Sequence, residues 1–297
     1  MTVFTFFLMN LAPGGPAAIV SMQTTPEQRE ALARELGLDH PVLERYGRWL
    51  AAAVTGNLGR SLDTQEPVSM LIGQRFPNTA LLALVTIAFT LLVGLPIGIV
   101  AAIRRGTFID RFSTVLSTVG QAVPDFWLGI ILIIAFTVAL HVLPASGMVT
   151  AGSDFNAADL AQHLVLPVLT LSVVLLPNIV RFARSALLDV LHHDYIRTAR
   201  AKGLPLRRVY IRHALRNAWI PIVAVIGLVI PLLLGGSVVV ESVFGWPGMG
   251  RLAVQAATDR DYNVVMGVTV FVGAIVILVN LLTDLVYALL DPRIRHA

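Results

Sequence analysis

Two long runs of the chain carry no charged side chain, and they constrain the fold more than any other feature. Residues 79–103 and 219–240 contain no Asp, Glu, Lys or Arg. A helix needs about 20 mostly apolar residues to cross the hydrocarbon core of a bilayer. Over the whole chain only 13% of residues are charged, about half the share in soluble domains. We therefore expect an all-α membrane protein.

Three weaker runs bring the expected number of full spans to five. Residues 264–290 contain one charge, Asp284, near their end. Residues 164–180 are shorter, and we expect Arg181 and Arg184 to reach from their end to the membrane interface. Residues 112–140 are long enough but contain three interruptions. These are Gln121, Pro124 and Asp125.

The first residues predict part of a sixth span. Residues 1–12 are apolar, but as a helix they would be about 18 Å long, against a hydrocarbon core of about 30 Å. They lack the basic flank and cleavage site of a signal peptide. We expect the outer half of a first span whose beginning lies upstream of Met1.

The placement of basic residues predicts the orientation of this six-span bundle. Fourteen of the 22 Lys and Arg lie in residues 104–111, 181–217 and 291–297. Because cytoplasmic loops carry an excess of basic residues, both termini should be cytoplasmic, with a tail at 291–297. The five-span core then covers residues 79–290 and includes a cytoplasmic loop at 185–217.

Residues 13–78 should form an extracytoplasmic helical segment. Residues 25–28 read Thr-Pro-Glu-Gln, a capping-box pattern that predicts a helix as far as residue 36. A second helix should begin at Pro41 and carry an apolar stripe. Its members are Val42, Leu43, Tyr46, Trp49 and Leu50. We interpret the segment as a cap on the outer surface of the bundle.

Several function classes are disfavoured. The chain has no cysteine, hence no thiolate metal site or cysteine nucleophile. Its only lysine, Lys202, is followed by glycine, so a Walker-type ATPase loop is excluded. Neither His-Glu-x-x-His nor Gly-x-Ser-x-Gly occurs, so no catalytic constellation supports a membrane enzyme. The net charge of +4 lies in loops between spans, which favours an orientation signal over nucleic-acid binding. We expect no cofactor.

Acidic residues within the spans are scarce. Carriers driven by ion gradients usually keep ionisable groups near mid-membrane, and the two candidates are Asp125 and Asp284. Asp125 follows Pro124 and precedes an apolar run, so we prefer helix capping to a proton relay. Asp284 lies near the cytoplasmic end of the last span. An ion-coupled secondary transporter therefore remains the alternative rather than the prediction.

The cytoplasmic loop predicts a short helix that is presented to a soluble partner. Tyr195, Ala199 and Lys202 occur at i, i+4 and i+7, on one helical face, and Gly203 should end the helix. A second helix should follow with an arginine stripe that meets lipid phosphates. Its members are Arg208, Arg212 and Arg216.

Residues 197–204, which read Arg-Thr-Ala-Arg-Ala-Lys-Gly-Leu, resemble the coupling loop of ATP-binding-cassette (ABC) importer permeases in the dipeptide and oligopeptide branch. Arg197 and Thr198 depart from the general Glu-Ala-Ala pattern of importers, whereas Ala199 and Gly203 keep it. Further segments resemble the same branch in order and spacing. These are residues 11–16, 56–61, 124–129, 244–250 and 291–293.

The resemblance implies a permease subunit in a bacterial cytoplasmic membrane. Its implied partners are a second homologous permease, two ABC ATPase subunits, an extracytoplasmic solute-binding protein and membrane lipid. Di- and oligopeptides are the implied substrates, with nickel or another small solute as the alternative. The implied ATPase-coupling residues are Tyr195, Arg197, Ala199, Lys202 and Gly203. An outer loop is expected to form a gate, a docking edge or a simple turn, and its residues are Phe244, Gly245, Trp246, Pro247, Gly248 and Gly250.

Overall fold

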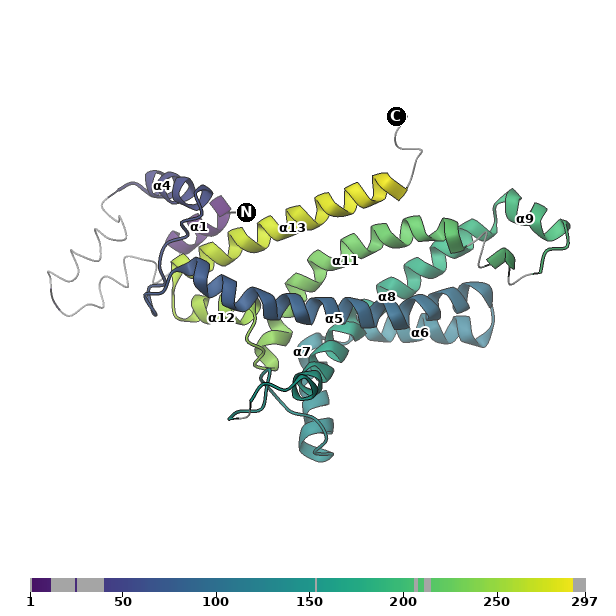
Figure 1. The fold of residues 1–297 in the computed structure, drawn as a ribbon, viewed down its shortest axis with the longest axis horizontal. Helices are drawn as coiled ribbons and strands as arrows, with labels where there is room; N and C mark the ends of the chain where they lie inside the picture. Colours follow the sequence, from purple (N-terminus) through teal and green to yellow (C-terminus); the bar gives the residue numbers. More distant parts are fainter. Residues whose placement is uncertain are drawn as a thin grey trace. The chain divides into compact units, whose positions relative to one another are not determined.

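The computed structural model describes residues 2–11, 25, 40–152, 154–205, 208–210 and 215–290. Among these residues the regular structure is helical, apart from one isolated antiparallel bridge between Arg60 and Pro67 (Figure 1). The elements are α1 (Thr2–Leu11), α4 (Val42–Val54), α5 (Val68–Ile103), α6 (Phe108–Ala122), α7 (Asp125–Leu132), the π-helix η1 (Ile133–Ala139), α8 (Ala157–Leu191), α9 (Asp194–Ala201), α11 (Arg216–Val243), α12 (Met249–Thr258) and α13 (Tyr262–Leu290).

Within the described residues, three helices are long and apolar enough to cross a membrane: α5, α8 and residues Tyr262–Val286 of α13. The segment from α6 to η1 makes a fourth if it is taken as one broken span. α11 contains the whole of the uncharged run 219–240. The second helix predicted within residues 13–78 is present as α4. The expected helix at 26–36, Arg212 and the tail at 291–297 lie outside the described residues.

α5 begins well before the apolar run that predicted it. The amides of Met70 and Leu71 donate to the Pro67 carbonyl, which places the helix start directly after that proline. The added turns are held by packing, because Val68, Leu71 and Ile72 are buried. A search for uncharged residues misses such turns, since they contain polar residues on the opposite face.

The chain forms two compact units. The first comprises residues Met1–Thr79 and Pro247–Ile275, and the second comprises Ala80–Trp246 and Val276–Ala297. In the first unit, Asp261 is buried and links two segments that are distant in sequence. Its Oδ2 accepts hydrogen bonds from the Ser61 hydroxyl at 2.5 Å and the Leu62 amide at 2.9 Å, and its Oδ1 accepts one from the Val264 amide at 3.2 Å.

α8 is the central helix of the second unit and packs against α6, α7 and α11. Glycines allow close contact with α5: a Cβ built on Gly98 would lie 2.7 Å from the Val180 carbonyl oxygen. A Cβ on Gly120 of α6 would lie 3.1 Å from the Val173 carbonyl. Pro177 has no amide to donate to Val173, so Gly120 lies against a carbonyl that the proline leaves without its helical partner.

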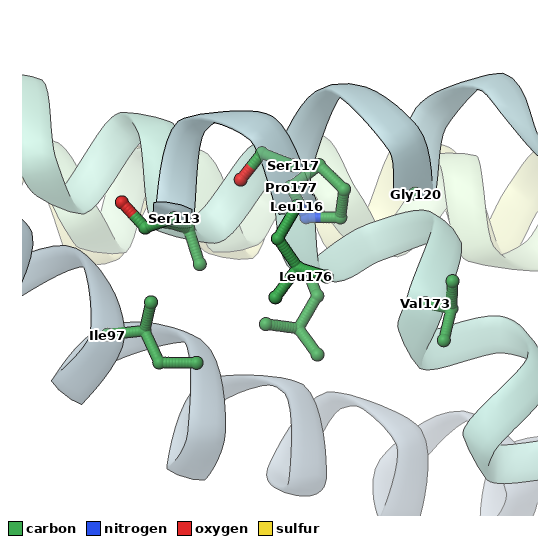
Figure 2. A pocket seen from close by; sticks show the side chains of 9 residues that line it. Ile97, Ser113, Leu116, Ser117, Gly120, Val173, Leu176 and Pro177 are labelled. Atoms are coloured by element: carbon green, nitrogen blue, oxygen red, sulfur yellow. The ribbon is translucent and has the colours of Figure 1, made fainter. Parts of the chain in front are cut away.

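A cavity of about 120 Å³ lies beside this contact. Figure 2 shows Ser113, Ser117 and Gly120 on one helix, opposite Val173 and Pro177 on another. Its lining is almost entirely apolar. The cavity therefore offers few groups that could bind a polar ligand.

The predicted run 112–140 is divided at Pro124. α6 ends at Ala122, and α7 starts at Asp125 with its axis turned by 97°. Asp125 lies in the first turn of α7, where its Oδ1 accepts a hydrogen bond from the Phe126 amide at 2.8 Å. The predicted capping role of Asp125 is wrong, because Pro124 holds the N-cap position, no side chain caps α7, and Asp125 lies one residue inside the helix.

The prediction for Arg184, at the end of the apolar run 164–180, is wrong. α8 continues to Leu191, and Arg184 pairs with Asp110 instead of reaching alone to the interface. Its Nε lies 2.6 Å from Asp110 Oδ1, and a terminal nitrogen lies 3.0 Å from Oδ2. Asp110 is buried, and this bidentate geometry is what makes burial of its charge tolerable. Arg181 is exposed and contacts Asn178 only at 3.4 Å.

Candidate functional site

The short helix α9 is attached to the end of α8 by one apolar face. Ile196 is fully buried and Ala199 is 7% exposed. Both belong to an apolar cluster with Ala183, Leu187 and Val190 of α8. The small Ala199 lets the α9 backbone lie close to the helix below it, while Ile196 supplies most of the buried surface.

The opposite face of α9 is polar and exposed. Tyr195 is 42% exposed, and its ring stacks on that of His193 with the centroids 5.7 Å apart. Arg197 lies 3.4 Å from Asp194 in an exposed ion pair, and Lys202 is exposed. An exposed pair of this kind contributes little to stability, so this face is not needed to hold α9 in place.

The predicted face is therefore divided between two environments. Tyr195 and Lys202 are exposed as a recognition surface requires, whereas Ala199 points into the chain. Ile196, which sequence reasoning missed, is the anchor. The signal was present: Ile196 and Ala199 are three residues apart in an otherwise polar segment, which is the spacing of a buried helical face.

Gly203 ends α9 as predicted. Its φ is +73°, and the amide of Leu204 donates to the Ala199 carbonyl at 3.4 Å, which is the long-range bond of a Schellman cap. In the described part of the chain, no atom beyond the two adjacent residues lies within 4 Å of a Cβ built on Gly203. A side chain at this position would therefore be disfavoured by the left-handed backbone rather than by a clash with the described residues.

The loop between α5 and α6 is tied to the end of α8 that leads into α9. The Gly106 amide donates to Asp110 Oδ2 at 2.9 Å, and Asp110 holds Arg184 of α8. The side chains of Arg105 and His192 lie 3.5 Å apart. α9 is therefore attached to the end of α8, where the Asp110–Arg184 ion pair and apolar packing both restrict movement.

The outer loop is a buried structural element. Phe244 and Trp246 are 2% and 0% exposed and belong to the apolar core of the second unit. The Trp246 amide donates to the Glu241 carbonyl, and Gly245 between the two aromatic residues has a φ of +57°. A surface that docks a partner cannot use side chains that the chain itself covers.

The rest of that loop belongs to the first unit. The Pro247 carbonyl accepts a hydrogen bond from Asn78 at 2.8 Å. Gly248 precedes α12 at its N-cap position, and Gly250 lies buried in the first turn of that helix. The connection between α11 and α13 is consequently more than a simple turn, because α12 lies between them.

Comparison with known families gives two matches that together cover almost the whole chain. Residues 94–296 match the binding-protein-dependent transport system inner membrane component. Residues 1–83 match the N-terminal part of the membrane component of such systems.

Individual relatives match over nearly their full length. A putative peptide permease of Brucella suis is 44% identical, over 99% of this chain and 94% of the relative. The oligopeptide transport system permease AppB of Bacillus subtilis is 42% identical, and the dipeptide transport system permease DppB of Escherichia coli is 39% identical. Each covers 100% of this chain and 94% of its own length.

Solved structures show the same fold at low identity. The inward-facing MetNI methionine ABC transporter matches with a TM-score of 0.61 and 20% identity, over 75% of this chain and 97% of the other. An amino acid ABC transporter matches with a TM-score of 0.54 and 16% identity, over 76% of this chain and 94% of the other.

Proposed function

The chain belongs to the binding-protein-dependent transport system inner membrane component family, and from that premise we propose that it carries peptides through a pathway that α9 couples to a separate ATPase. It is a permease subunit of an ABC importer and not itself an enzyme. Relatives named for dipeptide and oligopeptide transport support the peptide substrate. The ATPase subunits hydrolyse the nucleotide, and the binding protein delivers the peptide.

The observation that carries the coupling role is the two-sided environment of α9. Its inner face, Ile196 and Ala199, is fixed on α8, while Tyr195, Arg197 and Lys202 remain exposed. A helix that transmits force needs a firm attachment on one side and an accessible surface on the other. Movement imposed on the exposed face would be passed to α8, because close-packed interiors transmit displacement.

We propose the six-span arrangement with both termini cytoplasmic. Contacts within each unit support it, because they join segments that the charge distribution assigns to the same side. The first unit combines the external segment after residue 40 with the connection that contains α12. In the second unit, Arg105 and Asp110 from one predicted cytoplasmic loop contact His192 and Arg184 near the other.

The remaining partners follow from the same assignment. A second homologous permease would complete the pathway, since one chain supplies about half of a bundle that encloses a peptide. Two ATPase subunits would bind at the cytoplasmic face, one beneath each permease. Closure of those subunits on ATP would push on α9 and switch the bundle between inward-facing and outward-facing states, as packed domains do in rigid-body transitions.

The experiment reverses charge on the exposed face alone. The variant Arg197→Glu/Lys202→Glu should fold, because neither side chain is buried. ATP-dependent peptide uptake by the reconstituted complex should nevertheless fall at least about tenfold, the effect of losing about 1.4 kcal/mol of coupling or docking energy. The matched control is Arg111→Glu, an exposed arginine outside α9, which should keep its uptake.

Two measurements decide the result. Subunit yield after purification reports assembly, and uptake per assembled complex reports coupling. Normal uptake in the double variant at normal yield would refute the role of α9. Uptake driven by an ion gradient without ATP would refute the importer assignment itself and restore the secondary transporter.

A further inference from the structure

The break between α6 and α7 lies within an apolar segment and requires a physical reason. Pro124 separates the two helices, whose axes differ by 97°. In lipid, backbone groups outside a helix have no water to bond, so a break at membrane depth is tolerated only where it is buried in protein or lines a water-filled cavity.

A cavity of about 370 Å³ adjoins this break. It lies between α7, α8 and α11, and its volume falls within the range of about 300–1,000 Å³ that ligand sites occupy. The cavity in Figure 2, at about 120 Å³, falls below that range. The wall of the larger cavity includes Leu171 and Leu175 of α8 and Leu233 of α11. The large cavity is thus apolar along most of its surface.

Among the described residues that line this cavity, Asp125 alone is ionisable. Its Oδ1 is held by the Phe126 amide, and the positive end of the α7 dipole favours its negative charge. None of the ion pairs formed by the described residues involves Asp125. A carboxylate within a membrane-spanning segment is costly, and such a residue is a candidate for a substrate or ion pathway.

We propose that this cavity receives the amino-terminal end of the transported peptide and that the Asp125 carboxylate pairs with its α-ammonium group. The inference rests on the proposed peptide transport and adds a specificity residue to it. One carboxylate among leucines suits a single organic cation beside an apolar side chain. A divalent metal ion would take several oxygen or nitrogen ligands, so a metal fits this wall less well.

Gly235 leaves room for the first side chain of the peptide. It lines the cavity and is exposed, and among the described side chains beyond its two neighbours none lies within 4 Å of a built Cβ. A larger residue there would project into open space without disturbing the helix packing around it. Charge recognition and available volume can therefore be altered separately, at Asp125 and at Gly235.

The first test uses the complete reconstituted importer with its binding protein saturated with trialanine. Asp125→Asn keeps an oxygen that can accept from the Phe126 amide but removes the charge, whereas Asp125→Glu keeps the charge. Uptake should fall about five- to tenfold in the Asn variant, in line with the loss of a charged hydrogen bond. The Glu variant should retain at least half of it. Asp154→Asn, an exposed acid outside the cavity, is the matched control and should match the wild type.

The second test compares two peptides within one variant. In Gly235→Leu, uptake of Phe-Ala-Ala should fall at least about threefold more than uptake of trialanine, each relative to the wild type, because the leucine occupies the space for the first side chain. A ratio within one variant is insensitive to its folding yield. An unchanged ratio would show that the cavity does not receive this residue.

The results separate the inference from the function on which it rests. A wild-type complex that takes up no peptide with ATP would overturn the proposed function. Peptide uptake that is unaffected by Asp125→Asn would leave that function standing and overturn the role of Asp125. Equal losses of uptake in the Asn and Glu variants would also overturn it, because the Glu variant keeps the negative charge that the proposed pairing requires.

Discussion

α9 and the loop at residues 244–250 both carry motifs that indicate an interaction surface, yet the polar face of α9 is exposed whereas the aromatic residues of the loop are buried. α9 buries two small or medium apolar residues and leaves its charged face exposed. The loop buries its two largest side chains, Phe244 and Trp246, completely or nearly so. The difference shows that a sequence motif of this family can form either an exposed interaction surface or a buried part of the core. Burial decides which it is.

The physical basis of the contrast is the size and polarity of the buried groups. Aromatic side chains bury large apolar areas and dominate core energetics. Burial of such side chains in a neighbouring core therefore stabilises a loop that is rich in them. α9 offers arginine, lysine and tyrosine, whose polar ends are costly to bury without partners. Only Ile196 and Ala199 are available for packing, and they set its orientation.

The largest test of this contrast removes the buried aromatic residue of the loop. Trp246→Ala should cost about 3–5 kcal/mol, the usual range for an aromatic residue truncated in a core. The permease should lose most of its heat resistance in detergent, measured as the fraction that stays monodisperse. Trp127→Ala is the matched control, because Trp127 is 50% exposed. Similar stability of the two variants would break the comparison.

The next test weakens the attachment of α9. Ile196→Ala should cost about 2–4 kcal/mol of local stability, as expected for a buried aliphatic residue. The helix should then detach more often, and trypsin should cleave at Arg197 and Lys202 faster while the rest of the chain stays intact. Tyr195→Ala, on the exposed side, should leave the cleavage rate close to that of the wild type. Slow cleavage in the Ile196 variant would show that the cap and the neighbouring loops hold α9 without it.

A smaller effect is expected from the ion pair beneath α9. Arg184→Met leaves the buried Asp110 without its partner. Breaking a fully buried pair costs about 3–5 kcal/mol. The Arg184 side chain is 30% exposed, and exposed pairs contribute at most about 1 kcal/mol, so we expect about 2 kcal/mol.

Thermal denaturation in detergent measures this loss, and Arg181→Met, which breaks no ion pair, should be close to neutral. The double variant Asp110→Asn/Arg184→Met should recover part of the stability, because it removes the uncompensated charge. If the stability loss of the double variant equals the sum of the losses caused by Asp110→Asn and Arg184→Met separately, the two side chains do not act as a pair.

The smallest effect concerns the cap of α9. Gly203→Ala should cost about 1–2 kcal/mol locally, because an L-residue must adopt the left-handed conformation there. Gly47→Ala, in the exposed helix α4 with no atom within 4 Å of the new Cβ, should have the opposite sign and stabilise by about 0.5–1 kcal/mol. Hydrogen exchange of the amides in each helix measures both changes. Equal signs would contradict the assigned backbone conformation of Gly203.

Much of the candidate site could be predicted from residue spacing alone. The polar segment ending in Gly203 predicts a short capped helix, and the structure contains it from Asp194 to Ala201. The assignment of Ala199 to the partner surface was wrong in orientation, because spacing gives a shared face without saying what that face contacts. The pairing of Asp110 with Arg184 could not be predicted, since 74 residues separate them.

The sequence by itself determined that this chain is helical, crosses a membrane and belongs with importer permeases. These conclusions depend on local properties: the length of uncharged runs, the placement of arginines and the order of short motifs. The tertiary structure alone decided which motif stays accessible, which arginine is paired and where an acidic residue lines a cavity. Those outcomes depend on contacts between segments far apart in the chain, and no local pattern encodes the geometry of such contacts.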